Sequence, residues 1–294
     1  MDGGSVMQLV IASAHKTRQG KFMKPSFRLG LTSGAILLAS CASFAAPVTA
    51  THGGSPAILT GAHVATLSFS EYMQAALFLA DSHVTAEPGY GQVSSSPDSQ
   101  GTLLWRAIGD MPLASLTYDD VTGDILSQTF AGRFTVSTGA DDFMSTGGQL
   151  SVTSLTIDLA HGLVLLGVEN QEDPIAIWRW RQISGVTNVF RPGLSAWGPA
   201  NGDVNAQPVL TIDASQLGLQ LSALAFTDEG RAFFSQSQGY LEPGDNVMRE
   251  LTDFGSITTA VPEASACSLL AFGLVTAIAA TRRKKRVAPS TADV

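Results

Sequence analysis

The stretch QLSVTSLTIDLAHGLVLLGV, Gln149–Val168, decides the fold class of this chain. Two runs rich in Val, Leu, Ile and Thr flank the turn-forming residues Ala160–Gly162. Residues of this kind favour strands, and a short turn with glycine between two strands predicts a β-hairpin. The apolar residues of the first run do not alternate perfectly around Thr153 and Ser154, which predicts a β-bulge there.

Similar short segments recur on both sides of this hairpin and predict a mainly β body. Strands separated by turn residues at such intervals are typical of antiparallel sandwiches. We therefore expect an antiparallel β-sandwich-like body with one or two short helices, and Ser94–Gln100 (SSSPDSQ) as a loop. The further strands are expected at Leu103–Ile108, Ser127–Val136, Ile175–Ile183, Val209–Ile212 and Leu219–Phe226.

Two segments carry the start signals of short helices. Ser70 is a favoured N-cap residue ahead of a helix that we expect to reach Ser82, and Thr227 precedes one expected to end near Gln238. Acidic residues follow each cap, which suits the partial positive charge of a helix N-terminus. The side chains expected on the buried faces are Tyr72, Ala76, Leu79 and Ala80 in the first helix and Ala232 and Phe233 in the second.

The charge of the body, taken as residues 47–260, bears on its partners. This span contains 22 acidic residues, seven arginines and no lysine, which is a formal net charge of −15. Phosphate binding needs a basic face, so the composition argues against nucleic acid as a partner. Both cysteines, Cys41 and Cys267, lie outside the span, which excludes a disulfide framework or a thiolate metal site within it.

The N-terminal end has the pattern of a secretory signal peptide. Basic residues between Lys21 and Arg28 precede the uncharged stretch Leu29–Ala46. A basic flank, a short apolar segment and small residues at the cleavage site define such signals. Residues 1–46 are therefore interpreted as a leader and signal helix, with Met23 as the expected start.

Two alternatives remain open at this end. Leu38–Cys41 (LASC) matches a lipobox, in which Cys41 would carry a lipid and become the new N-terminus. The apolar segment could also stay in place as an uncleaved anchor helix. All three interpretations place the body outside the cytoplasm.

The C-terminal end has the pattern of a transmembrane helix held in one orientation. Residues 264–281 (ASACSLLAFGLVTAIAAT) carry no charge. As a helix with a rise of about 1.5 Å per residue they would span about 27 Å, close to the thickness of a bilayer core. A block of cations follows at once and is expected to stay cytoplasmic, which leaves the body outside. The cations are Arg282, Arg283, Lys284, Lys285 and Arg286.

Val261, Pro262 and Glu263 stand directly before this helix. The order of motif, apolar helix and terminal Arg-rich cluster resembles the PEP-CTERM sorting signal, with Ala264 in place of the usual second proline. The resemblance implies recognition by an exosortase in the inner membrane, removal of the tail near the motif, and delivery of the body to the cell surface or extracellular matrix. A transmembrane anchor that is never cut is the alternative.

This resemblance divides the chain into three parts and extends weakly into the body. The parts are the signal, an extracytoplasmic β-rich domain at residues 47–258, and a sorting signal at residues 259–294. Gly147–Val152 with Leu155–Leu159, and Leu251–Ile257, are similar to segments of PEP-CTERM proteins from Gram-negative proteobacteria. Such bodies are β-rich and of unassigned activity, so the similarity implies no site.

The body carries no motif for catalysis. It lacks G-x-S-x-G, H-E-x-x-H and a phosphate-binding loop, so we expect no catalytic residue, no cofactor and a non-enzymatic protein. One acidic turn is a candidate calcium site, since that ion needs several oxygens from a tight turn. Its carboxylates are Asp119, Asp120 and Asp124, and ordinary turn chemistry also explains them.

The string Trp178-Arg179-Trp180-Arg181 is the second candidate site. On a strand both tryptophans share one face, and an open face could stack on sugar rings. The alternative, which the usual burial of such residues favours, places Trp178 and Trp180 in the core with the arginines paired to nearby acids.

The expected function is that of an exported, non-enzymatic surface or matrix protein associated with exopolysaccharide. Its partners in export would be signal peptidase and an exosortase, with the inner membrane holding the C-terminal helix in transit. A carbohydrate- or calcium-dependent binding module is the first alternative, and a secreted hydrolase is the second.

Overall fold

The computed structural model describes residues 46–54, 56–98, 101–199 and 207–261. The expected signal peptide, Pro262 and Glu263 of the expected sorting motif, the apolar segment 264–281 and the basic cluster lie outside these residues. Within the described ranges, no helix combines the length and the apolar character that crossing a membrane requires.

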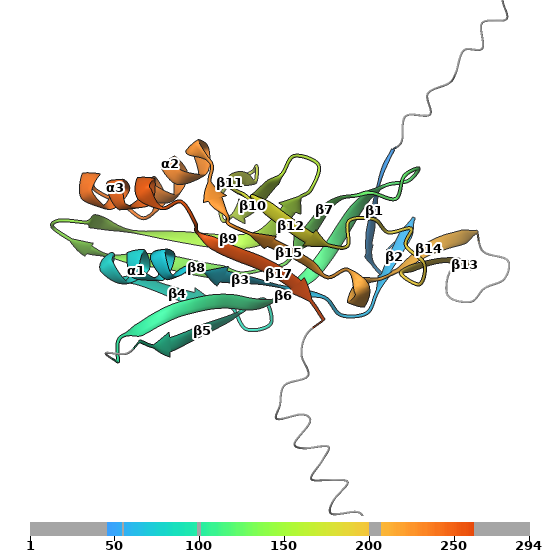
Figure 1. Cartoon of the computed structure of the whole chain (residues 1–294), viewed down its shortest axis with the longest axis horizontal. Coiled ribbons are helices and arrows are strands. Elements are labelled where there is room, and N and C mark those ends of the chain that lie inside the picture. The colour runs from blue at the N-terminus through green and yellow to red at the C-terminus, as the bar shows by residue number, and fades with distance from the viewer. Residues whose placement is uncertain (1–45, 55, 99–100, 200–206, 262–294) are drawn as a thin grey trace, which may run out of the picture. The chain divides into compact units, whose positions relative to one another are not determined.

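The described residues are mainly β, as the sequence predicts, and seventeen strands form one curled, mostly antiparallel sheet (Figure 1). In chain order the strands are β1 (Pro47–His52), β2 (Ala57–Thr60), β3 (Val64–Phe69), β4 (Ser82–Ala86), β5 (Gln92–Pro97), β6 (Leu103–Asp119), β7 (Ile125–Phe130), β8 (Phe134–Asp141), β9 (Ser145–Asp158), β10 (Leu163–Val168), β11 (Ile175–Arg179), β12 (Gln182–Gly185), β13 (Ser195–Pro199), β14 (Pro208–Asp213), β15 (Leu219–Ser222), β16 (Ala225–Phe226) and β17 (Gly255–Ala260). Two pairings, β1 with β2 and β2 with β14, are parallel.

The long strand β6 joins the two halves of the sheet. Its first part pairs with β5 and β3, and its second part pairs with β1 and β7. The change of partners follows a bulge, where Gly109 and Asp110 face a single residue of β3. Because β6 belongs to both halves, the sheet curls over its own core and the expected pair of separate sandwich layers is one continuous sheet.

Each half of the sheet is a simple series of neighbouring strands. One half has the order β5–β6–β3–β17–β15–β12. The other has the order β13–β14–β2–β1–β6–β7–β9–β10–β11–β16, and β8 and β4 continue it beside the first part of β9.

The hairpin that decides the fold class is confirmed as β9 and β10. Asp158 pairs with Leu163 across the turn, and Gly162 adopts a φ of 72°, a conformation that favours glycine. The register shifts where Gly167 and Val168 face the segment around Thr153. The bulge predicted at Thr153 is therefore confirmed.

Several expected strands have different bounds. Ser94–Pro97 belongs to strand β5, so the loop expected at Ser94–Gln100 is wrong over these four residues. Three expected strands are interrupted because the chain moves to a new neighbour: β11 pairs with β16, whereas β12 pairs with β15 in the other half of the sheet. The interruptions fall at Ala131–Arg133, Trp180–Arg181 and Ala223–Leu224.

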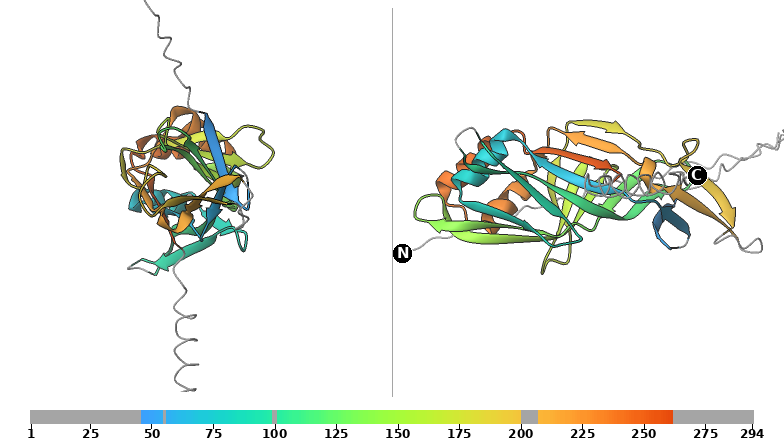
Figure 2. Two further views of the ribbon diagram at one scale, coloured as in Figure 1. Left: turned by 90° about the vertical axis from the view of Figure 1, so that its right-hand side faces the viewer. Right: turned by 90° about the horizontal axis from the view of Figure 1, so that it is seen from below.

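Three helices, α1 (Glu71–Leu79), α2 (Asp228–Ser237) and α3 (Glu242–Glu250), gather at one end of the sheet, and the β13–β14 hairpin lies at the other (Figures 1 and 2). The N-cap predicted at Ser70 is confirmed, and Thr227, which opens the second predicted helix, is the N-cap of α2. The Ser70 hydroxyl accepts a hydrogen bond from the Met73 amide at 3.1 Å, and the Thr227 hydroxyl accepts one from the Gly230 amide at 2.8 Å. A 3-10 turn at Ala214–Gln216 follows β14.

The buried face of each predicted helix is partly wrong. In α1, Ala76 is buried as expected, but Tyr72 and Leu79 are 76% and 59% exposed and Met73 and Leu77 take their place. In α2, Ala232 is exposed and Phe234 fills the core. In both helices the rotation about the helix axis is decided by the strands beneath, so propensity and capping do not determine it.

Candidate functional site

The outer face of the sheet is lined with hydroxyl groups across strands β1, β6, β7 and β9. Side chains alternate between the two faces of a strand, and the inward row here is fully apolar except for Gln128. Two outward rows follow the register of the four strands. They are Thr51, Ser115, Thr129 and Thr156, and Thr49, Thr117, Ser127 and Asp158.

Neighbouring hydroxyls of this face bond to one another. Thr49 and Thr117 are 3.1 Å apart between hydroxyl oxygens, and Thr129 and Thr156 are 3.0 Å apart. Cross-strand threonine pairs of this kind stabilise a sheet. The hydroxyl groups of these two pairs thus already have hydrogen-bond partners on the same face.

The same pattern continues along β4, β8 and β9, where the surface is hollowed. Thr85, Thr135 and Ser151 lie opposite one another on these three strands. They form the floor of a groove of about 330 Å³. Such a volume lies at the lower end of the range for small-molecule pockets.

The walls of the groove carry charged and polar groups that come from distant parts of the chain. They are Glu87, Arg133, Thr153 and Glu169. Among the described residues, the side chains of Thr85, Thr153 and Glu169 have no hydrogen-bond partner. They are free to bind a ligand.

Arg133 is held in place from two sides. Its guanidinium lies 3.4 Å from the Glu87 carboxylate and 4.7 Å from the centre of the Tyr90 ring. The Glu87 amide donates to the Arg133 carbonyl at 3.0 Å, and the Arg133 amide donates to the Tyr90 carbonyl at 3.3 Å. The exposed ion pair adds little stability, but with the ring contact it orients the guanidinium, and the two backbone bonds fix the main chain that carries it.

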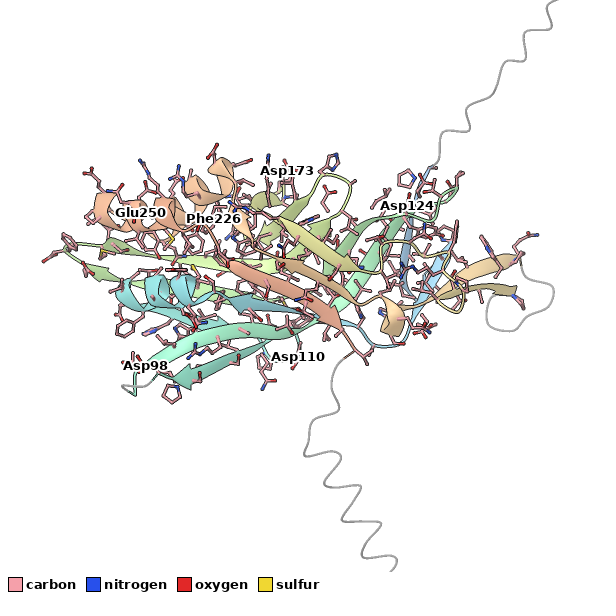
Figure 3. All side chains as sticks on the ribbon, viewed as in Figure 1. Asp98, Asp110, Asp124, Asp173, Phe226 and Glu250 are labelled. Atoms are coloured by element: carbon pink, nitrogen blue, oxygen red, sulfur yellow. The ribbon has the colours of Figure 1, made fainter. Side chains whose placement is uncertain are left out.

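A second, more open hollow of about 830 Å³ adjoins the groove. Both are lined by Thr85 and Ala86, so they meet at the end of β4. Asp110, labelled in Figure 3, lines the second hollow from the bulge of β6. Its φ of 57° is a left-handed conformation that an aspartate adopts more readily than most residues.

The predicted calcium residues lie at the other end of the sheet from the helices, where Asp124 is labelled in Figure 3. The Asp119 carboxylate accepts hydrogen bonds from the amides of Thr122 and Val121 at 2.8 and 2.9 Å, which lower its pKa. Asp124 accepts from the Asn188 amide group at 2.9 Å, and Asp120 accepts from a backbone amide.

These three carboxylates thus serve as turn and loop acceptors. Within the described ranges, no three His, Cys, Asp or Glu side chains are grouped so that they could hold a metal ion.

The candidate sugar-binding face is not open at Trp178, so the interpretation that this ring stacks on sugars is wrong. Trp178 is 2% exposed and packs among aromatic rings in the core. Trp180 follows the end of β11, is half-buried, and packs against the same core. Tryptophan is more often core than surface, which the alternative interpretation stated.

Comparison of the chain with family models, curated proteins and solved structures found no match.

The groove is a feature that sequence reasoning missed. Its lining comes from four segments, around residues 85, 133, 151 and 169, that only the strand pairing brings together. The alternation of Ser and Thr along Thr49–Thr51, Ser115–Thr117 and Ser127–Thr129 was a readable sign of a hydroxylated face.

Proposed function

We propose that this chain is an exported, non-enzymatic protein that an exosortase sorts to the cell surface or extracellular matrix. The observation that carries the proposal is the order of three elements at the C-terminal end. Val261-Pro262-Glu263 comes first, the uncharged residues 264–281 follow, and Arg282–Arg286 comes last. In this proposal the apolar segment is a transmembrane helix and the N-terminal signal is a cleaved helix.

The end of the folded body favours processing at this motif. Strand β17 ends at Ala260 and is paired with β3 on one side and β15 on the other. Val261 follows directly and is 47% exposed. A cut after the motif would therefore remove no strand from the sheet.

The start of the body favours signal cleavage in the same way. Strand β1 begins at Pro47, directly after the small residues of the expected cleavage site. It is held between β6 and β2. Removal of residues 1–46 would leave this strand complete, and the acidic body would suit an extracytoplasmic setting.

The proposal is tested by the intact mass of the exported protein, from cells that contain an exosortase and from matched cells without one. With the exosortase we expect a surface form that begins near Pro47 and ends near Glu263. Glu263→Gln should accumulate a longer, membrane-bound form, whereas Glu250→Gln, an equivalent change on α3, should be processed normally.

Two results would overturn the proposal. A surface form that keeps residues 264–294 in exosortase-containing cells would show a plain anchor. A full-length, unprocessed and soluble protein in the cytosol would exclude export altogether.

A further inference from the structure

We infer that the groove and the adjoining hollow, together called the β4 cleft, bind a segment of a neutral polysaccharide. The β4 cleft consists of the residues that line either hollow. They lie on β4, β8 and β9, on the turn after β4, at the starts of β3 and β5, at Asp110 in the bulge of β6 and at Glu169 after β10. The inference deepens the proposed function and rests on it for biological meaning, because an exported matrix protein meets polysaccharide.

The shape of the β4 cleft suits a polymer. Its two hollows, of about 330 and 830 Å³, share Thr85 and Ala86 of β4. The second hollow is open to solvent along Pro88–Val93. A chain of linked sugars can occupy both hollows and continue beyond them, whereas a compact metabolite would fill only one.

The chemistry of the lining suits hydroxylated ligands. Every sugar hydroxyl both donates and accepts hydrogen bonds, so it needs partners of both kinds. Thr85 and Thr153 offer free hydroxyls, and Glu169 offers a carboxylate without a partner among the described residues. Thr135 and Ser151 add a pair of hydroxyl groups 3.3 Å apart on the groove floor.

The charge of the cleft selects a neutral polymer over an acidic one. Arg133 is the one cation among the lining residues, and its charge is shared with Glu87 at 3.4 Å. Glu169 and Asp110 add two more carboxylates. Together with a body of net charge −15, these groups repel a polyanion.

The polar groups of the cleft are set before a ligand arrives. Thr85, Thr135 and Ser151 stand on paired strands, so their spacing is fixed by the sheet. Arg133 is oriented by Glu87 and by the Tyr90 ring. A preorganised set of donors and acceptors loses little conformational freedom on binding. The left-handed backbone of Asp110 is consistent with this role, because unusual backbone geometry is enriched at ligand sites.

The test is native affinity electrophoresis of the full-length chain in detergent, through gels that contain a polysaccharide. The neutral probes are a mixed-linkage β-glucan, dextran and a galactomannan, and the acidic probe is alginate. We expect at least one neutral probe to retard the protein and alginate to leave it unaffected.

The variant Thr85→Val with Thr153→Val removes two free hydroxyls and keeps the shape of both side chains. We expect its affinity for the retarding polysaccharide to fall about tenfold, since each hydrogen bond accounts for roughly a threefold change. The matched control is Thr258→Val, an exposed strand threonine of β17 outside the cleft, which should bind like the wild type. Glu169→Gln is an independent test, and we expect it to lower the affinity for the same polysaccharide about threefold or more.

Three outcomes would overturn the inference. They are no retardation by any neutral probe, stronger retardation by alginate, and equal loss in the cleft variants and in Thr258→Val. Circular dichroism of each variant shows whether it folds, and Glu169→Gln covers the case in which the double variant does not. Failure here leaves the mass-based test of sorting untouched, so the two proposals fail separately.

Discussion

The indole ring of Trp178 lies 4.4 Å from the phenyl ring of Phe254, measured between ring centroids. Phe254 stands directly before β17, the last strand of the body, and its ring also meets Phe69 at 5.7 Å and Phe226 at 5.3 Å. The segment that leads into β17 is thus packed into the core between β3, β11 and β16. These ring contacts hold the residues that lead into β17 against the core.

Phe254→Ala should lower the free energy of unfolding by about 3–5 kcal/mol, because it deletes a buried ring from a packed aromatic cluster. Urea unfolding followed by tryptophan fluorescence measures this, since Trp178 is itself in the cluster. Phe143→Ala is the control, because Phe143 is exposed at the tip of the β8–β9 hairpin. Equal effects of the two substitutions would contradict the pinning role of Phe254.

Ser70→Ala should destabilise the body by about 1–2 kcal/mol. The Ser70 hydroxyl caps α1 through the Met73 amide and also donates to the Asp253 carbonyl at 2.6 Å. The substitution therefore loosens both α1 and the segment ahead of β17. Ser95→Ala on the edge strand β5 is the matched control, with an expected change within about 0.5 kcal/mol. The shift of the urea unfolding midpoint, measured for each variant against the wild type, gives both changes in stability.

His63 should make the body less stable in mild acid. Its side chain is 2% exposed, neither ring nitrogen has a hydrogen-bond partner within the described residues, and burial lowers its pKa from 6.5 to about 4. The unfolded chain therefore binds a proton more tightly than the folded one. Stability contributed by the neutral ring is present above pH 6.5 and is lost as the pH falls toward 4.

The loss attributable to His63 between pH 7 and pH 4 should be about 3 kcal/mol, at about 1.4 kcal/mol per pKa unit. Urea unfolding at both pH values measures it as the difference between the wild type and His63→Leu, in which the carboxylate contributions cancel. The exposed His52→Leu should keep the pH dependence of the wild type. If His63→Leu keeps it too, the buried neutral ring is not its source.

Asp245→Asn should weaken the packing of α2 against α3. The Asp245 carboxylate accepts from the Ser235 hydroxyl at 2.8 Å and forms ion pairs with Arg249 at 2.8 Å and Arg231 at 3.1 Å. The Ser235 hydrogen bond, followed by the contacts with Arg249 and Arg231, lowers the pKa of Asp245. The stabilisation is present above the usual aspartate pKa and is lost as the pH falls through the lowered value.

For this partly exposed carboxylate we expect a cost of about 1 kcal/mol at pH 7 and a smaller one at pH 3. Asp173→Asn is the control, because Asp173 lies exposed in the loop between β10 and β11 (Figure 3). Thermal unfolding of the three proteins at both pH values provides the comparison. A cost that does not change with pH would rule out the charge as its cause.

Sequence reasoning succeeded where neighbours along the chain decide the structure. The caps at Ser70 and Thr227, the turn at Gly162 and the bulge at Thr153 each depend on a few adjacent residues. Such local signals are strong because the same hydrogen bonds form wherever the segment occurs.

It failed where distant segments decide the structure. Tyr72 and Met73 are equally compatible with the buried face of an isolated helix, and only the strands beneath α1 select Met73. The groove unites Thr85, Arg133 and Glu169 through strand pairings that no local pattern encodes. Helix α3 escaped notice because Pro243 and Gly244 in its first turn lower helix propensity.

The close packing of α2 on the sheet provides the last prediction. Gly230 is in the first turn of α2, and a Cβ atom there would collide with the carbonyl oxygen and Cα of Ile177 on β11. The helix is held at this distance by Thr227, whose hydroxyl donates to the Ala176 carbonyl at 2.6 Å and whose amide donates to the Ile177 carbonyl at 3.0 Å. A glycine at position 230 leaves room for this close approach.

Two opposing effects therefore decide how Gly230→Ala changes the stability. Alanine favours a helix over glycine by about 1 kcal/mol, whereas overpacking against a strand backbone costs about 1–3 kcal/mol, and more when the backbone cannot move. Because the clash is with backbone atoms of a buried strand, we expect net destabilisation of about 1–2 kcal/mol in urea unfolding. Gly198→Ala on the edge strand β13, where a Cβ would meet no atom within 4 Å, should leave stability unchanged. A Gly230→Ala protein as stable as the wild type would mean that α2 can move away from β11 at no cost.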